Sequence, residues 1–143
     1  MTWLKEKIAY ARGILNKRKA YNGPHLLQFN ITNFCNFNCI GCYFHSPLRN
    51  ERFSDEWEKQ KMPRDVILRL VDEAAQIKTS KILLTGNGEP TLYPALYDTI
   101  ERIKNHKMGC LVSTNGVIID EEMLFRFHAL RLDALLLSLF PSL

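Results

Sequence analysis

Three of the four cysteines in this 143-residue sequence fall close together, at Cys35, Cys39 and Cys42. Thiolates at this spacing on one loop can converge on a metal centre, and thiolates suit zinc or an iron–sulfur cluster. Iron–sulfur clusters commonly take four cysteines, so three ligands would leave one iron without a protein ligand. Catalytic metal sites keep such an open position, whereas structural sites are closed. The spacing therefore favours a reactive metal centre.

Later in the chain, short polar and glycine-rich segments lie at the carboxyl ends of apolar runs. The segment 86–90 comes directly after the apolar run 81–85, and residues 114 and 115 end the run that starts at Gly109. The candidate binding residues in these segments and in the last apolar run are Gly86, Asn87, Gly88, Glu89, Pro90, Thr114, Asn115 and Ser138. As glycine, asparagine and proline also favour turns, a purely structural role for 86–90 is the alternative.

The elements that must position these residues alternate between strands and helices. Apolar runs predict strands at 25–32, 81–85, 109–114 and 135–139, and periodic apolar residues predict helices beginning near Pro63, spanning 94–106, and beginning after Asp120. This order predicts an α/β fold with a parallel sheet. The long interval after the first strand contains the cysteines and a charged stretch, 49–61, which we expect to be an exposed loop or short helix. In such folds sites lie at the carboxyl ends of the strands, where all candidate residues fall.

At these residues the sequence resembles the radical S-adenosylmethionine (SAM) family over about 25–143. The three cysteines match the family signature, 86–90 looks like its Gly-Gly-Glu-Pro element, and 113–116 looks like a Thr-Asn-Gly element. The strand 137–139 resembles one that offers a polar contact to SAM. Two positions depart from the pattern: Gly41 replaces the usual aromatic residue before the third cysteine, and Asn87 replaces a glycine.

The resemblance implies a 4Fe–4S cluster on Cys35, Cys39 and Cys42, whose fourth iron binds SAM. Reductive cleavage of SAM would give a 5'-deoxyadenosyl radical that abstracts hydrogen from a substrate, either a peptide or a small molecule. Gly88 and Glu89 would hold the methionyl amine of SAM. Thr114 and Ser138 would contact its carboxylate, its ribose or the substrate. By analogy, a flavodoxin or ferredoxin would supply the electron.

The resemblance also concerns the extent of the fold, because the family barrel usually has six strands. We expect a partial parallel βα barrel with about four of them, formed by a core domain at 23–143 after an N-terminal helix at 1–22. We therefore expect a fragment, or a chain whose last strand is covered by another chain. The other possibilities are an iron–sulfur or zinc module without radical chemistry and an inactive truncated product. For structural zinc, His45 would complete a Cys₃His set.

Composition narrows the remaining possibilities. The sequence is 46% hydrophobic and 24% charged, which is ordinary for a globular protein, and it has no apolar run long enough to span a membrane. The net charge is +4, but six basic residues against Glu6 give residues 1–20 a charge of +5. The rest is nearly neutral, so no broad nucleic-acid surface is indicated. The apolar stripe of Leu4, Ile8, Ala11 and Leu15 favours a helix that caps the domain, with membrane or RNA contact as alternatives. We expect Cys110 to be a core residue and the protein to be cytoplasmic.

Overall fold

The sheet has four parallel strands in the order β1-β2-β3-β4. The computed structural model describes the backbone of residues 2–139 and the side chains of residues 4, 5 and 7–139. The strands are β1 (Leu26–Asn30), β2 (Lys81–Thr85), β3 (Gly109–Thr114) and β4 (Ala134–Leu137). All three pairings are parallel. The predicted α/β class is confirmed, and the arrangement is that of a partial βα barrel.

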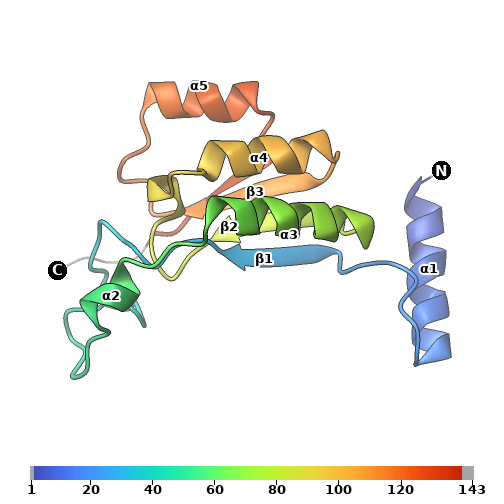
Figure 1. Cartoon of the computed structure of the whole chain (residues 1–143), viewed down its shortest axis with the longest axis horizontal. Helices are drawn as coiled ribbons and strands as arrows, with labels where there is room; N and C mark the ends of the chain where they lie inside the picture. Colours follow the sequence, from blue (N-terminus) through green and yellow to red (C-terminus); the bar gives the residue numbers. More distant parts are fainter. Residues whose placement is uncertain (1, 140–143) are drawn as a thin grey trace.

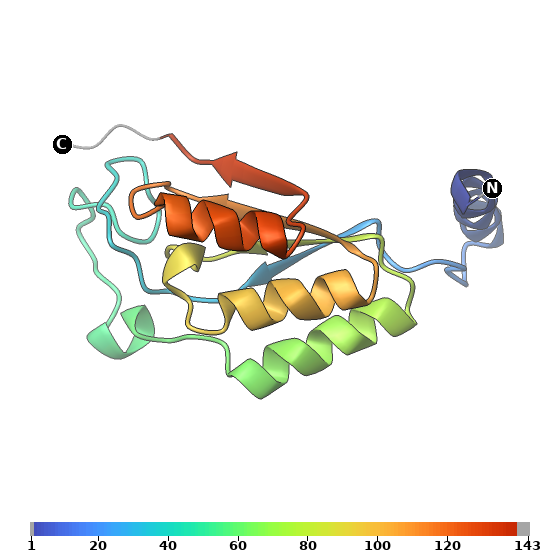
Figure 2. The same ribbon diagram turned by 90° about the horizontal axis from the view of Figure 1, so that it is seen from above.

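The three longer helices that connect the strands cover the same face of the sheet (Figures 1 and 2). They are α3 (Arg64–Gln76), α4 (Leu96–Asn105) and α5 (Glu121–Ala129). When strands follow one another in sequence order and every crossover has the same hand, the helices must fall on one face. The start of α5 is as predicted, since the Asp120 side chain accepts a hydrogen bond from the N–H of Met123 at 2.8 Å.

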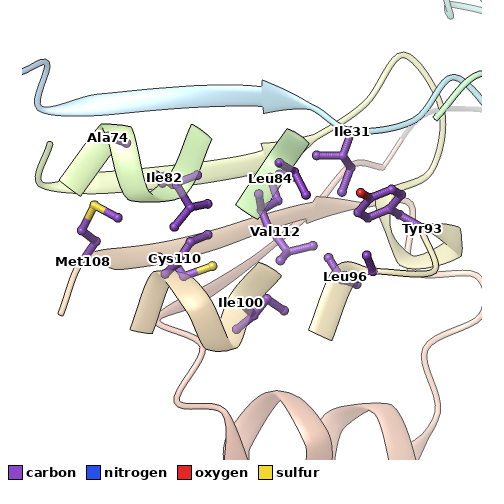
Figure 3. Close-up of a cluster of buried hydrophobic side chains, with 14 of the residues drawn as sticks. Ile31, Ala74, Ile82, Leu84, Tyr93, Leu96, Ile100, Met108, Cys110 and Val112 are labelled. Carbon is purple, nitrogen blue, oxygen red and sulfur yellow. The ribbon is translucent and has the colours of Figure 1, made fainter. Parts of the chain in front are cut away.

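The core lies between this face of the sheet and the helices (Figure 3). Alternate residues of β2 and β3 point into it and are completely buried, namely Ile82, Leu84, Cys110 and Val112. They meet apolar side chains of α3 and α4, among them Ile67, Val71, Leu96, Ile100 and Ile103. Cys110 is therefore a core residue, as predicted. Burial raises the pKa of its thiol to about 12, which keeps it protonated and unreactive.

The outer strands are shorter than the sequence predicts. The N–H of Ile31 still donates to Thr85 O at the end of β2, at 2.8 Å. The chain then leaves the sheet, because Ile31 O accepts from the N–H of Met62 at 2.9 Å and Thr32 forms an isolated bridge with Lys61. β4 ends at Leu137, so Ser138 lies just beyond the strand. Its N–H still donates to Thr114 O at 2.8 Å, which keeps it next to the end of β3.

The insertion after β1 is a loop with one short helix, α2 (Asp55–Glu58), as expected for 49–61. Aromatic side chains hold it together. The Trp57 ring stacks on Phe53, with ring centroids 4.0 Å apart, and on Phe44, at 5.6 Å. Because Phe44 follows the last clustered cysteine by two residues, this stack anchors the cysteine loop to α2.

A helix, α1 (Thr2–Asn16), lies in the predicted segment 1–22 but ends at Asn16, earlier than predicted, and its apolar stripe does not cap the domain. Leu4, Ile8 and Leu15 are 59%, 50% and 81% exposed. The expectation of a helix that buries this stripe on the domain is therefore wrong. None of the helices within residues 2–139 is long and apolar enough to cross a membrane.

Four basic residues occupy left-handed backbone positions just after helices, with φ between 57° and 63°. They are Lys17, Lys78, Lys107 and Arg131. Only glycine adopts this conformation without a steric cost. We expect Lys78→Gly, after α3, to raise the free energy of unfolding by about 1 kcal/mol, measured by urea denaturation. Lys59→Gly is the matched control, because Lys59 directly follows α2 at φ −83° and gains nothing from glycine. If the two substitutions changed the free energy of unfolding equally, the left-handed backbone of Lys78 would not be the cause.

Candidate functional site

A pocket of about 140 Å³ opens at the carboxyl ends of the strands. It is lined by all of the predicted metal and cofactor-binding residues except Cys42 and Asn87. The chain after each of the four strands contributes to it: the loop after β1 with Cys35 and Cys39, the segment 86–90 after β2, the end of β3 with Asn115, and Ser138 after β4. Two lining residues were not predicted, Thr85 and Ser113, which lie on the strands themselves. Because successive residues of a strand point to opposite faces, a polar residue next to a buried apolar one was the sequence signal that could have identified them.

The cysteine loop folds into turns that direct backbone N–H groups at sulfur. The N–H of Cys42 donates to Cys39 O at 3.0 Å. The Cys42 sulfur accepts from the N–H groups of Phe44 at 3.4 Å and His45 at 3.3 Å. Hydrogen bonds of this kind stabilise a thiolate and tune a metal cluster bound to it. Cys42 lies in the same loop as Cys35 and Cys39, although it does not line the pocket.

Two thiols of this loop, those of Cys35 and Cys39, have raised pKa values. Burial is the largest cause of the raised pKa of Cys35. A backbone hydrogen bond from Phe37 lowers this pKa, and the nearby charges of Glu89, Cys42 and Cys39 raise it. Burial followed by the charge of Cys42 raises the pKa of Cys39. These two thiols therefore keep their protons near neutral pH, and metal cations would have to displace those protons in order to bind.

By type, the three thiols of this loop fit an iron–sulfur cluster with one open iron, although the structure does not bring them together around one point. Within residues 2–139, no three cysteine, histidine, aspartate or glutamate side chains lie close enough to hold a metal ion. His45 contacts this loop through its backbone, and its ring lies 6.3 Å from that of Trp57. Its Nε2 atom is buried and has no hydrogen-bond partner among the described residues.

Glu89 is the centre of the hydrogen-bond network in the pocket. The residue is only 2% exposed. Its Oε1 accepts from the hydroxyls of Thr114 at 2.7 Å and Thr91 at 2.6 Å, and from the N–H of Thr91 at 3.0 Å. Its Oε2 accepts from the N–H of Asn115 at 2.7 Å. Glu89 thus joins the end of β2 to the end of β3. Thr91 was not predicted, although Glu-Pro-Thr is a recognisable capping pattern.

The hydroxyl groups of the pocket differ in what they can offer a ligand. Thr114 donates to Glu89 and accepts from the N–H of Gly116 at 3.0 Å, so both of its functions are engaged within the chain. Ser113 and Ser138 face each other with their oxygens 3.4 Å apart. This weak pair leaves most of their hydrogen-bonding capacity available. The two serines are therefore the better-placed hydroxyls for a bound molecule.

Asparagine side chains join the loops around the pocket. Asn87 donates to the Oδ1 of Asn33 at 2.9 Å, and Asn33 donates to Trp57 O at 2.9 Å. Asn115 donates to Asn36 Oδ1, also at 2.9 Å. Asn87 thus lies outside the pocket lining and instead ties the 86–90 segment to the chain leaving β1, which gives its departure from the family pattern a structural role.

The glycines of the 86–90 segment are required because two stretches of backbone touch. The N–H of Gly88 donates to Thr32 O at 3.1 Å, and that of Glu89 donates to Phe34 O at 2.8 Å. A Cβ atom on Gly88 would lie 2.1 Å from the Phe34 oxygen, and one on Gly86 would lie 2.5 Å from the Thr32 oxygen. This contact holds the segment against the start of the cysteine loop.

We expect Gly88→Ala to lower the free energy of unfolding by about 3 kcal/mol, because the added methyl group forces the two backbones apart. Thermal or urea denaturation of the metal-free protein measures this loss directly. Gly13→Ala in α1 is the matched control, since its Cβ would make only an ordinary contact at 3.5 Å with Lys19 O. If Gly88→Ala unfolds like the unmodified protein, the close contact does not exist in solution.

Comparison with known proteins identifies similar chains. Residues 29–140 match the family model described as the Radical SAM superfamily. The cofactor-modifying protein of tungsten-containing aldehyde ferredoxin oxidoreductase from Pyrococcus furiosus is 29% identical over 116 residues, which are 79% of this chain and 30% of that protein. The Fe-coproporphyrin III synthase of Methanosarcina barkeri is 31% identical over 109 residues, covering 69% of this chain and 25% of that protein.

The fold also matches a solved structure. BtrN in complex with AdoMet and 2-DOIA superimposes with a TM-score of 0.70 over 85% of this chain and 48% of that one, at 15% sequence identity. At this identity the match concerns the fold alone. The chain spans at most 30% of the length of the two curated relatives described above.

Proposed function

Because the chain belongs to the radical SAM superfamily, we propose that its cysteine loop holds a 4Fe–4S cluster and that the adjoining pocket receives SAM. The observation that carries the proposal is the convergence in one pocket of two clustered cysteines with the ends of β2 and β3. Such strand ends are where parallel βα folds place their sites. When bound, the cluster would supply the electron that cleaves SAM to methionine and a 5'-deoxyadenosyl radical able to abstract hydrogen from a substrate.

In this proposal Cys35, Cys39 and Cys42 each bind one iron, and the fourth iron is left for SAM. The N–H groups of Phe44 and His45 hold the Cys42 sulfur and reduce its negative charge. Binding of the irons would release the protons of these thiols, and burial of Cys35 and Cys39 makes that release harder. The aromatic stack on Trp57 keeps this loop in place.

The residues after β2 and β3 would bind the polar groups of SAM. Glu89 is held by its four hydrogen bonds in one orientation, and its Oε2 accepts only one of them, so it retains a site for an ammonium donor. Gly88 lets the backbone approach closely at the same point. Thr114 positions Glu89, while Ser113 and Ser138 are proposed to contact the carboxylate or ribose of SAM, or the substrate.

The substrate and the electron donor are part of the same proposal. The substrate would be a peptide or a small molecule, and the electron would come from a flavodoxin or ferredoxin. The Fe-coproporphyrin III synthase described above is named for a small molecule, which supports a small-molecule substrate, whereas another relative is named a PqqA peptide cyclase, which supports a peptide.

Anaerobic SAM cleavage tests the proposal. Protein reconstituted with iron and sulfide is incubated with SAM and dithionite, and 5'-deoxyadenosine and methionine are measured by mass spectrometry. We expect both products in equal amounts, and neither without reconstitution. Cluster-loaded protein that leaves SAM intact would instead indicate an iron–sulfur module without radical chemistry. Colourless protein with one zinc per chain would indicate a structural site.

A further inference from the structure

The N-terminal helix α1 (Thr2–Asn16) stands apart from the sheet and from the helices that cover it (Figures 1 and 2). The proposed chemistry does not use it. From the arrangement of its exposed residues we propose that α1 and the basic residues after it bind the surface of an anionic lipid membrane, with the helix lying in the plane of that surface.

One side of α1 faces the rest of the chain. Among the described side chains of the helix, Ala9, Tyr10 and Gly13 are half-buried, and the hydroxyl of Tyr10 donates to Gly23 O at 3.3 Å. A Cβ atom on Gly13 would lie 3.5 Å from Lys19 O. These residues therefore fix which side of the helix is turned inward.

The apolar stripe lies on the opposite side and has no partner among the described residues. With 3.6 residues per turn, Leu4, Ile8, Ala11 and Leu15 fall on one narrow strip of the helix, roughly opposite Gly13. Leu15 is 81% exposed and Ile8 50%. Ile14, at the edge of the strip, is 75% exposed. A helix that turns its apolar stripe outward needs an apolar environment to receive it.

Basic side chains lie beside this stripe. On the helical wheel Lys5 and Arg12 lie on one flank and Lys7 on the other. Their long stems can lie along an apolar surface while the charges reach headgroups. Three further exposed basic residues, Lys17, Arg18 and Lys19, follow the helix directly. Each cation near an anionic bilayer adds to the attraction.

The apolar stripe and the basic residues beside it together indicate which kind of partner α1 binds. RNA would be attracted by the charges but would give the apolar stripe nothing to bury. A second copy of the stripe would bury it, but would bring together two segments of +5 each. An anionic bilayer satisfies both features, because it offers hydrocarbon beneath a layer of negative charge.

Vesicle co-sedimentation tests this surface with the metal-free chain, so its outcome is independent of the proposed SAM chemistry. We expect binding to phosphatidylglycerol-rich vesicles that weakens at least ~10-fold on pure phosphatidylcholine and at high salt. Ile8→Glu and Leu15→Glu should each weaken binding ~10-fold or more, since each loses the burial of one large apolar side chain. Phe125→Glu in α5, where the side chain is 72% exposed, is the matched control and should bind like the unmodified chain.

Three outcomes would overturn the proposal. The first is that the chain stays in the supernatant with phosphatidylglycerol vesicles. The second is that Phe125→Glu weakens binding as much as Ile8→Glu does, which would indicate general surface adsorption. The third is that the chain is dimeric in light scattering and Ile8→Glu makes it monomeric, which would show that a second copy covers the stripe.

Discussion

Cys39→Ala is expected to lower the iron content of anaerobically reconstituted protein from about four atoms per chain to near background, and to abolish SAM cleavage. Cys39 lines the pocket and supplies one of only three thiolates in the loop. With two ligands left, a cluster cannot be held in a defined position. Iron and sulfide analysis together with the visible absorption of the protein measures the effect.

Cys110→Ala is the control, because this fourth cysteine is buried in β3. The substitution removes one sulfur from the core, so it should cost about 1 kcal/mol of stability and leave the iron content unchanged. If Cys110→Ala loses iron while Cys39→Ala retains it, the cysteine loop is not the metal site.

Glu89→Gln is expected to weaken SAM binding at least ~30-fold and to lower the free energy of unfolding by about 2 kcal/mol. Every hydrogen bond that the Glu89 carboxylate makes is accepted, from Thr91, Thr114 and Asn115. An amide of the same shape must present N–H groups to at least one of these donors, and it removes the negative charge proposed to attract the methionyl amine. Equilibrium dialysis with SAM and urea denaturation measure the two effects.

Glu122→Gln makes the same chemical change on an exposed residue at the start of α5, where the Glu122 side chain is 76% exposed. It should change neither SAM binding nor, by more than about 0.5 kcal/mol, stability. If Glu89→Gln instead lost stability but kept its affinity for SAM, Glu89 would be a structural bridge between β2 and β3 only.

Much of this site follows from sequence, because short-range patterns determine it. The cysteine spacing places three thiolates on one loop whatever the rest of the chain does. The alternation of strands and helices brings the residues after β2 and β3 to one edge, and the structure places Gly88, Glu89, Thr114 and Asn115 around one pocket there. The helix cap at Asp120 and the buried Cys110 were equally local inferences.

The contacts that join these segments were beyond prediction. The bridge between Asn33 and Asn87 links residues 54 positions apart, and that between Asn36 and Asn115 links residues 79 apart. Such pairs depend on the register of neighbouring loops, for which one sequence carries no signal. The packing of these loops also decides that the Thr114 hydroxyl bonds to Glu89 and that the Ser113 hydroxyl can bond to a ligand.

The N-terminal helix shows a different limit of sequence reasoning. Periodicity correctly predicts that α1 has an apolar stripe, but it gives no information about what the stripe faces. For a helix beside a folded domain, the core of that domain is the default partner, yet Leu15 is 81% exposed and the inward side carries Ala9 and Gly13. The packing direction was set by the turn at 17–24, where Tyr10 meets Gly23.

Electron paramagnetic resonance of the dithionite-reduced protein, recorded with and without SAM, tests the central claim most directly. If the cysteine loop holds a 4Fe–4S cluster whose open iron faces the pocket, the reduced protein gives the signal of a single cluster, and its g-values shift when SAM is added. Glu89→Gln should retain the signal and require far more SAM for the same shift. A cluster signal that is indifferent to saturating SAM would contradict the claim, as would the absence of any cluster signal.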